Sequence, residues 1–382
     1  MFSNHIDDIV NDITSLKTGL INLDQILQKV TNGHDLSVED IWRLLSINPL
    51  KDISSYKKVL EISQENKCCL FHNKIFAIVP VYVTSYCQEH CVYCNFRAGN
   101  KLMVERVRLT DDELLNEVKY LVSEKGLRVV ELVYATDPNV RIDSIIRHVR
   151  LVKDIVNGNH GLVGINAEPF DTDEYVKLKE GGLDFVVLWQ ETYDKETYQK
   201  VHIGNTKKTN FDYRINAFER MIEAGLDNIG LGVLSGLSDW RRDWFCLMLH
   251  EKYLNDTYGI TPNILGVPRL KPAVGAELKE TPYMLSDEEY KLAIAIHNIF
   301  SPLCMPFVNT REKWELCEEI SKGGGNLFTF NCSTIPGGYT LGKKGYQFPT
   351  YNFDASLFKD KALTDGFQPV FDWNFENIHE NT

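Results

Sequence analysis

Three cysteines, Cys87, Cys91 and Cys94, lie within one polar segment and form a C-x3-C-x2-C spacing. A structural zinc ion is held by four protein ligands, and a simple electron-transfer cluster is held by four cysteines. Three thiolates, with no fourth cysteine in the segment, leave one iron of a four-iron cluster open for a substrate-like ligand. The spacing therefore predicts a [4Fe-4S] cluster that takes part in chemistry.

A zinc site is the alternative for the same segment, because Cys91 and Cys94 form a Cys-x2-Cys pair and His90 lies beside them. Under this alternative the chain is a non-catalytic, zinc-binding barrel. The apolar run 77–84 that precedes the segment predicts a buried strand. The cysteines thus follow a strand directly, and Tyr82 near the end of that strand is predicted to line a ligand pocket.

Carboxylates follow the next three apolar runs of the chain. Asp137 comes after the second run, Glu168 after the third and Glu191 after the fourth. A charged side chain directly after a buried strand is costly unless it meets a ligand or a partner. For Asp137, a turn formed with Pro138 explains the residue equally well.

Arginines occupy comparable positions later in the chain. Arg214 follows the fourth run, Arg269 follows the sixth, and Arg311 with Glu312 follows the seventh. A planar guanidinium binds a carboxylate through two parallel hydrogen bonds, so these arginines are candidates for carboxylate recognition. A solvated helix residue is the alternative for Arg214, and a structural salt bridge is the alternative for Arg311.

The elements that must position these residues alternate between short apolar runs and amphipathic stretches. Eight runs with seven intervening helical patterns predict an α/β fold, a (β/α)8 barrel of the TIM type that binds ligands at the C-terminal ends of its strands. Capping boxes predict helix starts at Ser37 and Thr110. We expect an N-terminal helical extension over 1–75, the barrel over 76–338, and an irregular tail over 339–382 that covers the barrel. The predicted strands are 77–84, 128–135, 161–167, 184–190, 228–235, 263–267, 305–309 and 326–331.

Composition narrows the class of protein. The 382 residues carry a net charge of −12 without a run rich in Lys and Arg, which argues against a nucleic acid as the main partner. We see no signal-peptide pattern and no apolar run long enough to span a membrane, so no membrane partner is expected. Nine cysteines without secretory context indicate a reducing, cytoplasmic setting.

Together these segments resemble the radical S-adenosylmethionine aromatic amino-acid lyases over nearly the whole chain. The match is nearest to the tyrosine lyases of thiamine biosynthesis. Tryptophan lyases that make 3-methylindole-2-carboxylate share several segments, including one like Arg97–Asn100. Hydrogenase-maturation tyrosine lyases carry a further C-terminal cluster, whose cysteines this chain lacks. Asp137 stands where a Gly-Glu pair is usual, and Lys271 stands where an arginine is expected. The resemblance is carried by the cysteine segment and by Gln190–Tyr193, Gly230–Leu234, Gly236–Asp239, Pro268–Leu270, Thr310–Glu312 and Pro336–Tyr339.

The resemblance implies a reaction and its cofactors. The cluster reduces bound S-adenosylmethionine to methionine and a 5′-deoxyadenosyl radical, which abstracts hydrogen from an aromatic amino acid. A bond at Cα then breaks, and tyrosine yields p-cresol and the thiazole precursor 2-iminoacetate. Expected partners are the amino acid, with tyrosine favoured, an electron donor such as flavodoxin or ferredoxin, and thiazole synthase. The alternatives are a tryptophan lyase or another natural-product radical enzyme.

The resemblance also implies roles for single residues. Asp137 is expected to accept the methionine amino group, Arg214 to clamp the methionine carboxylate, and Arg311 to bind the substrate carboxylate. Tyr93 is expected beside the adenine. The predicted catalytic residues are Tyr82, Arg269, Arg311 and Glu312. The predicted cofactor-binding residues are Tyr93, Phe96, Asp137, Glu168, Glu191 and Arg214, and the predicted metal ligands are Cys87, Cys91 and Cys94.

Overall fold

The fold was described from a computed structural model of the chain. Thr310, in the segment Thr310–Glu312, lies outside the described residues, as do parts of the predicted extension and tail. The described residues are 1–6, 8–9, 22–33, 35–102, 105–156, 161–308, 311–330, 332–351, 355–376 and 378.

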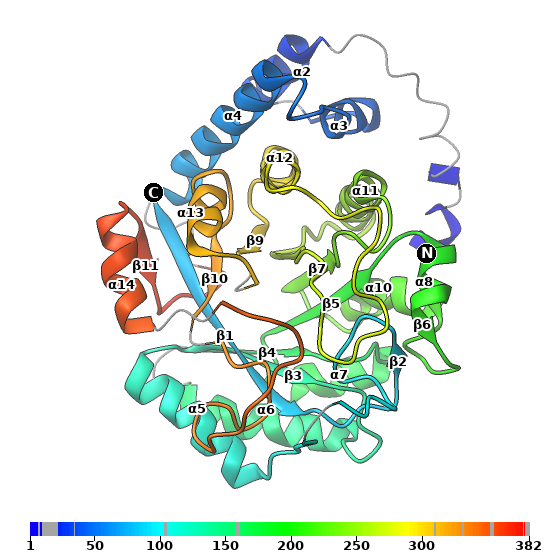
Figure 1. The fold of residues 1–382 in the computed structure, drawn as a ribbon, viewed down its shortest axis with the longest axis vertical. Helices are drawn as coiled ribbons and strands as arrows, with labels where there is room; N and C mark the ends of the chain where they lie inside the picture. The colour runs from blue at the N-terminus through cyan, green and yellow to red at the C-terminus, as the bar shows by residue number, and fades with distance from the viewer. Residues whose placement is uncertain are drawn as a thin grey trace.

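Eight parallel strands form a closed barrel, because the first strand pairs with both the second and the last (Figure 1). All eight predicted strands are present, and no boundary differs from its prediction by more than three residues. The predicted (β/α)8 fold is therefore confirmed. The barrel strands, in their order around the barrel, are β1 (Lys74–Thr84), β3 (Val129–Tyr134), β4 (Leu162–Asn166), β5 (Phe185–Glu191), β7 (Ile229–Val233), β8 (Ile264–Gly266), β9 (Met305–Val308) and β10 (Leu327–Thr329).

Helices connect the barrel strands, and their starts follow from local sequence. The side chain of Thr110 accepts a hydrogen bond from the backbone N–H of Glu113, whose carboxylate accepts one from the backbone N–H of Thr110, as the predicted capping box requires. These helices are α5 (Asp111–Lys125), α6 (Ile142–Val156), α7 (Thr172–Glu180), α8 (Lys195–Val201), α9 (Phe211–Ile215), α10 (Ala217–Glu223), α11 (Trp240–Tyr258), α12 (Asp287–Phe300) and α13 (Trp314–Lys322).

The extension before the barrel contains a short 3-10 helix η1 (Phe2–Asn4) and the helices α2 (Leu23–Thr31), α3 (Val38–Leu45) and α4 (Ile53–Phe71). The predicted capping box at Ser37 is present and starts α3. Helix α4 packs on α12, and α3 packs on α11 and α12, so the extension covers one side of the barrel (Figure 1).

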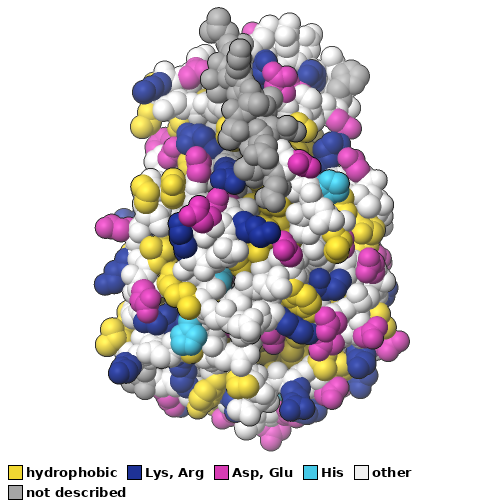
Figure 2. Space-filling model, turned by 90° about the vertical axis from the view of Figure 1, so that its right-hand side faces the viewer, with side chains coloured by type: hydrophobic (Ala, Val, Ile, Leu, Met, Phe, Trp, Pro, Cys, Tyr) yellow, Lys and Arg dark blue, Asp and Glu magenta, His cyan; other side chains and the backbone are white. Residues whose placement is uncertain are grey.

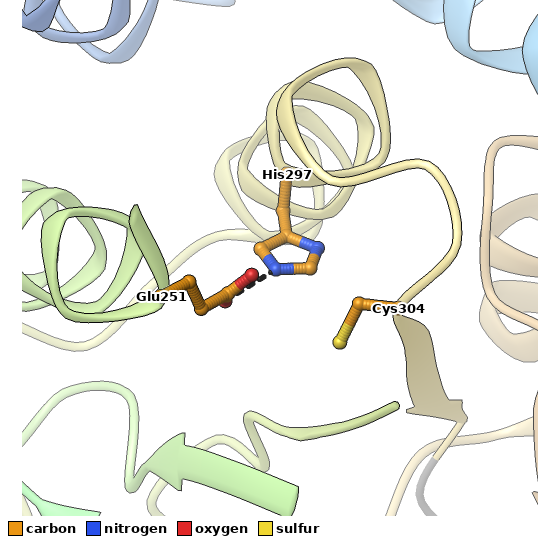
Figure 3. Close-up of side chains that lie close together, drawn as sticks. All are labelled: Glu251, His297 and Cys304. Atoms are coloured by element: carbon orange, nitrogen blue, oxygen red, sulfur yellow. Dashed lines mark hydrogen bonds and ion pairs between the residues drawn. The ribbon is translucent and has the colours of Figure 1, made fainter. Parts of the chain in front are cut away.

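A buried polar cluster joins α11 and α12 outside the barrel. Glu251 on α11 lies 2.7 Å from Nε2 of His297 on α12, and Cys304 approaches them from the segment before β9 (Figure 3). All three side chains are buried. The hydrogen bond partly satisfies two polar groups that would be costly to bury alone, and it fixes the two helices against each other.

The tail, residues 339–382, contains more regular structure than the predicted irregular segment. It forms α14 (Ala355–Thr364) and β11 (Gln368–Val370), and β11 pairs in parallel with the first residues of β1. Nε1 of Trp373 donates a hydrogen bond to the carbonyl of Ala77 at 2.8 Å. The predicted strand 77–84 began three residues late, and β3 pairs with β1 only from Val79 onward, so the first residues of β1 have a free edge for β11.

Small residues let bulky side chains enter the barrel. A Cβ at Gly266 on β8 would lie 2.3 Å from the ring of Trp189 on β5, so only glycine leaves room for that ring. The rings of Trp189 and Phe307 then pack edge to face at 6.1 Å. Together they make an apolar wall inside the barrel.

Charges are interspersed on the face of the molecule shown in Figure 2, where Lys and Arg side chains alternate with Asp and Glu. No helix among the described residues is long and apolar enough to cross a membrane.

Candidate functional site

A cavity opens at the C-terminal ends of the barrel strands. Its empty volume is about 1430 Å³, part of which is open to solvent. Every barrel strand, or the loop after it, contributes to the wall. The lining residues include Tyr82, Cys87, Glu89, Cys91, Tyr93, Cys94, Phe96, Arg97, Glu131, Val133, Asn166, Glu168, Trp189, Glu191, Lys208, Arg214, Lys271, Phe307, Arg311, Cys332, Gln347 and Phe348.

The cysteine loop, residues 85–96, brings all three predicted metal ligands to the cavity. Within it β2 (His90–Cys91) pairs antiparallel with β6 (His202–Ile203), which places Cys91 opposite His202. Burial raises the pKa of Cys87 and raises that of Cys91 to about 12. Such thiols become thiolates readily only when a metal compensates their charge.

Aromatic residues brace the cysteine loop. The hydroxyl of Tyr93 lies 2.8 Å from Nε2 of His202. The ring of Phe96 packs edge to face on Tyr82 at 6.0 Å, among Val133 and two of the cysteines. Both predicted aromatic residues therefore line the cavity and hold the loop against the barrel strands.

A buried guanidinium faces the cavity from α9. Nε of Arg214 donates to the carbonyl of Trp189 at 2.8 Å, and its Nη2 lies 3.5 Å from a carboxylate oxygen of Glu191. Glu191 has φ of +73°, a conformation that costs a non-glycine residue free energy and is concentrated at functional sites. Nη1 of Arg214 is buried without a hydrogen-bond partner among the described residues. It is therefore positioned to receive an anionic group.

Two carboxylates and a lysine complete this part of the wall. Glu89, within the cysteine loop, accepts a hydrogen bond from Thr206 at 2.9 Å, but its other oxygen is buried without a described partner. Burial and the neighbouring Glu89 raise the pKa of Glu168. Lys208 lines the same region. Glu89 and Lys208 were not among the predicted site residues, although a carboxylate between the cysteines of a cluster segment is itself a signal.

The unpartnered atoms of Arg214 and Glu89 together fit a ligand that carries both a carboxylate and an ammonium group. Each atom would otherwise stay buried without a hydrogen bond, which is rare in native proteins. The methionine end of S-adenosylmethionine has this pair of groups. The residues present therefore fit the predicted cofactor.

Asp137 does not reach the cavity, contrary to its predicted cofactor contact. Arg108 holds its carboxylate through two hydrogen bonds of 2.6 and 2.7 Å, and Thr84 donates a third at 2.6 Å. The backbone N–H of Asn139 also donates to it at 3.0 Å. These bonds outweigh burial and lower the pKa of Asp137. The alternative prediction, a turn formed with Pro138, therefore describes Asp137 better, and the residue also forms an ion pair with Arg108.

Arg269 and Glu312 also lie outside the cavity, contrary to their predicted catalytic placement. They form a buried salt bridge with two hydrogen bonds, and Arg269 additionally pairs with Asp287 at 2.7 Å. Lys271 joins Glu312 at 3.2 Å while lining the cavity. The pair fixes the loops after β8 and β9 to each other.

Arg311 lines the cavity and is stacked by the tail. Its guanidinium lies 3.5 Å from the ring centroid of Phe348, and Nη1 donates to the carbonyl of Arg269 at 3.2 Å. Burial lowers the pKa of Arg311, although its charge is retained. This places a partly buried cation at the mouth of the barrel.

Gln347, also from the tail, bridges the cysteine loop and the barrel. Its Oε1 accepts a hydrogen bond of 2.8 Å from the hydroxyl of Tyr82, and its Nε2 lies 3.5 Å from Sγ of Cys94. The aromatic character of the tail indicated that it covers the barrel, but nothing in the sequence marked Gln347 as part of the site.

Glu131 is the remaining charged residue of the wall that sequence reasoning missed. It lies in β3 and is 4% exposed, and Asn166 donates a hydrogen bond to it at 2.8 Å. Burial raises its pKa to about 7. The signal was present, since a glutamate interrupts an otherwise apolar strand, Val129–Tyr134.

Comparison with known proteins supports this reading of the cavity. Residues 81–247 match the model of the radical SAM superfamily. The chain is 28% identical over 355 residues to 2-iminoacetate synthase of Escherichia coli (strain K12), covering 91% of this chain and 90% of that protein. It is 26% identical over 287 residues to 3-methylornithine synthase of Methanosarcina acetivorans, covering 74% of this chain and 76% of that protein. The crystal structure of the FeFe-hydrogenase maturase HydG from Carboxydothermus hydrogenoformans has a TM-score of 0.88 at 27% identity and covers 98% of this chain and 86% of its own.

Proposed function

Residues 81–247 form a radical S-adenosylmethionine domain and the chain is an enzyme of that superfamily, and from this premise we propose that it cleaves tyrosine at Cα to 2-iminoacetate and p-cresol. The observation that carries the proposal is that one cavity is lined both by the cysteine loop and by a partly buried arginine, Arg311. A full-length relationship to 2-iminoacetate synthase supports the choice of substrate.

We assign the cofactors to the mouth of this cavity. Cys87, Cys91 and Cys94 would hold the [4Fe-4S] cluster, Arg214 the methionine carboxylate, and Glu89 the methionine ammonium group. Bound there, the cluster and S-adenosylmethionine supply a 5′-deoxyadenosyl radical. Tyr93, Phe96, Glu168 and Glu191 would border the cofactor.

The protein then has to hold the amino acid in one orientation beside the cofactor. Arg311 would bind the substrate carboxylate through its planar fork. Tyr82 would contact the substrate amine, and Gln347 fixes the Tyr82 hydroxyl from the tail. Such positioning shortens the search for a reactive geometry and supplies much of the rate enhancement of an enzyme.

A tryptophan lyase is the second candidate, because Arg97–Asn100 is shared with that subfamily. Arg97 lines the cavity, but its guanidinium also pairs with Glu277 at 2.8 Å, and both residues bind backbone carbonyls. Arg97 donates to the carbonyl of Gly275 at 3.0 Å, and Asn100 donates to that of Asn95 at 2.8 Å. These contacts join the cysteine loop to the loop after β8, and this bracing role requires neither tryptophan nor tyrosine.

An anaerobic assay tests the proposal. Cluster-loaded enzyme is mixed with reductant, S-adenosylmethionine and one amino acid, either tyrosine, tryptophan or phenylalanine. Tyrosine should give 5′-deoxyadenosine, p-cresol and glyoxylate from hydrolysed 2-iminoacetate. An indole product from tryptophan, with no p-cresol from tyrosine, would contradict the proposal.

The setting of the enzyme is proposed with the reaction. Flavodoxin or ferredoxin would supply the electron, and thiazole synthase would consume the unstable imine, in the reducing cytoplasm. Copurification with thiazole synthase, and turnover with reduced flavodoxin in place of a chemical reductant, would test these partners.

A further inference from the structure

The Glu131 carboxylate lies deep in the barrel cavity, below the level of the cysteine loop. Glu131 pairs in register with Pro80 of β1, two residues before the Tyr82–Val133 pair. Arg311, in contrast, follows the end of β9 at the mouth. The cavity therefore has a cation at its mouth and a carboxylate in its interior.

The Glu131 carboxylate is incompletely satisfied by the protein. Asn166 is the one described residue that donates a hydrogen bond to it, and no described cation lies within ion-pair distance. A carboxylate has about four acceptor sites. Burying it with one neutral donor is costly, and the raised pKa of Glu131 reflects that cost.

The surroundings of Glu131 offer apolar contacts rather than further donors. Trp189 and Phe307 contribute an aromatic wall, and Val133 lies above Glu131 on the same face of β3. A ligand that fills this space needs an apolar body. It also needs an O–H or N–H group at its inner end, because the buried carboxylate of Glu131 otherwise lacks a second hydrogen-bond donor.

From this arrangement we propose that Glu131 accepts a hydrogen bond from a donor at the end of the substrate side chain, and that the enzyme thereby selects amino acids with such a donor. The inference rests on the proposed function, which places the α-carboxylate at Arg311. For tyrosine the donor is the phenol O–H. Phenylalanine has the same body without the donor, so it leaves Glu131 unsatisfied and should bind much more weakly.

The test compares binding of tyrosine and phenylalanine to cluster-loaded enzyme with S-adenosylmethionine but without reductant, so that no turnover occurs. In the unaltered enzyme, tyrosine should bind at least tenfold more tightly. Glu131→Leu should abolish most of that preference, because it removes the acceptor. Glu131→Gln keeps the size and a polar end, so the preference should fall by a smaller factor.

The matched control is Glu251→Gln, which changes an equally buried carboxylate outside the barrel (Figure 3). It should leave the tyrosine-to-phenylalanine ratio unchanged. Iron content of each variant reports whether the cluster site is intact. If Glu131→Leu fails to fold, the ratio measured with Glu131→Gln decides, and an unchanged ratio there overturns the inference.

Two further probes separate this inference from the proposed function. The side chain of lysine ends in an ammonium group, and the side chain of tryptophan carries an indole N–H, so both amino acids also offer a donor. If the unaltered enzyme makes no p-cresol, the proposed function fails, yet a Glu131-dependent affinity for lysine or tryptophan over phenylalanine still supports the inference. If p-cresol forms and Glu131→Leu keeps the full preference for tyrosine, the inference alone is overturned.

Discussion

Arg311 is the residue whose replacement separates substrate binding from cofactor chemistry. Arg311→Lys keeps the charge but loses the planar fork and the stacking on Phe348. We expect amino-acid affinity to fall about tenfold or more, equivalent to about 1.4 kcal/mol, with cluster iron unchanged and cofactor cleavage largely uncoupled from product. Calorimetry and the ratio of 5′-deoxyadenosine to p-cresol measure these effects.

Arg97→Lys is the matched control, because Arg97 also lines the cavity but donates to the backbone carbonyl of Gly275 in the loop after β8. It should change amino-acid affinity far less than the Arg311 variant does. Unaltered affinity and product yield in Arg311→Lys would remove Arg311 from the substrate site.

The cysteines of the loop give the sharpest test of the cluster. We expect about four irons per chain in the reconstituted protein. Serine at Cys87, Cys91 or Cys94 should remove the cluster and all cofactor cleavage. Cys332→Ser is the control, since Cys332 lines the same cavity from beyond β10. Equal iron loss in that control, or zinc in place of iron, would refute the ligand assignment.

Neighbouring side chains after a strand point in different directions, and this decides which predicted residues reach the cavity. Arg311 lines it, whereas Glu312 turns into the salt bridge with Arg269. The sequence places such residues at the correct end of the barrel. It does not say which side of the wall each faces, because irregular loops lack the strict alternation of a strand. Glu131 was predictable in principle, since β3 has that alternation.

The strands were predictable because each is a short apolar run between amphipathic helices, and a strand buried on both faces has that composition. The capping boxes at Ser37 and Thr110 fixed helix starts through local hydrogen bonds. The strand β11 was not predictable. None of its three residues is buried, and they form a strand because the edge of β1 supplies partners from far along the chain.

The contact between β8 and β5 predicts a position-specific effect on stability. Gly266→Ala would place a methyl group 2.3 Å from the Trp189 ring, so the ring must move. We expect a loss of about 1–3 kcal/mol, as for other overpacked interiors, measured by denaturant unfolding. Gly323→Ala is the control, because its nearest neighbours would be 3.9 Å away. If Gly266→Ala leaves the free energy of unfolding unchanged, the wall around Trp189 is loosely packed and the prediction is wrong.

At the scale of the whole molecule, a buried histidine is expected to lower the free energy of unfolding at acidic pH. His250 stacks on Phe2 at 4.1 Å and lies 2.9 Å from the Tyr193 hydroxyl. Burial lowers its pKa to about 3. The unfolded chain binds a proton at this residue below about pH 6.5, and the folded chain does not. Stability should therefore fall as the pH drops from about 6.5 toward 3, by up to about 1.4 kcal/mol per pH unit.

Melting temperatures at pH 7.5 and 5.5 test this expectation in cluster-free protein, which removes acid damage to the cluster. His250→Phe cannot take up a proton in either state, so its melting temperature should depend less on pH. His5→Phe, at an exposed histidine, is the control and should behave like the unaltered chain. Equal pH dependence in all three proteins would exclude His250 as a source of acid sensitivity.

The bridge from Gln347 to Cys94 also has a consequence for the order of events in biosynthesis. The two residues are 253 positions apart, and the strand that closes the barrel, β10, is made late as well. The cysteine loop therefore leaves the ribosome long before its covering segment exists. During that interval the three thiols face the surrounding solution. Cluster delivery to a finished chain must therefore reach Cys94 with Gln347 already beside it, whereas delivery to a nascent chain would not.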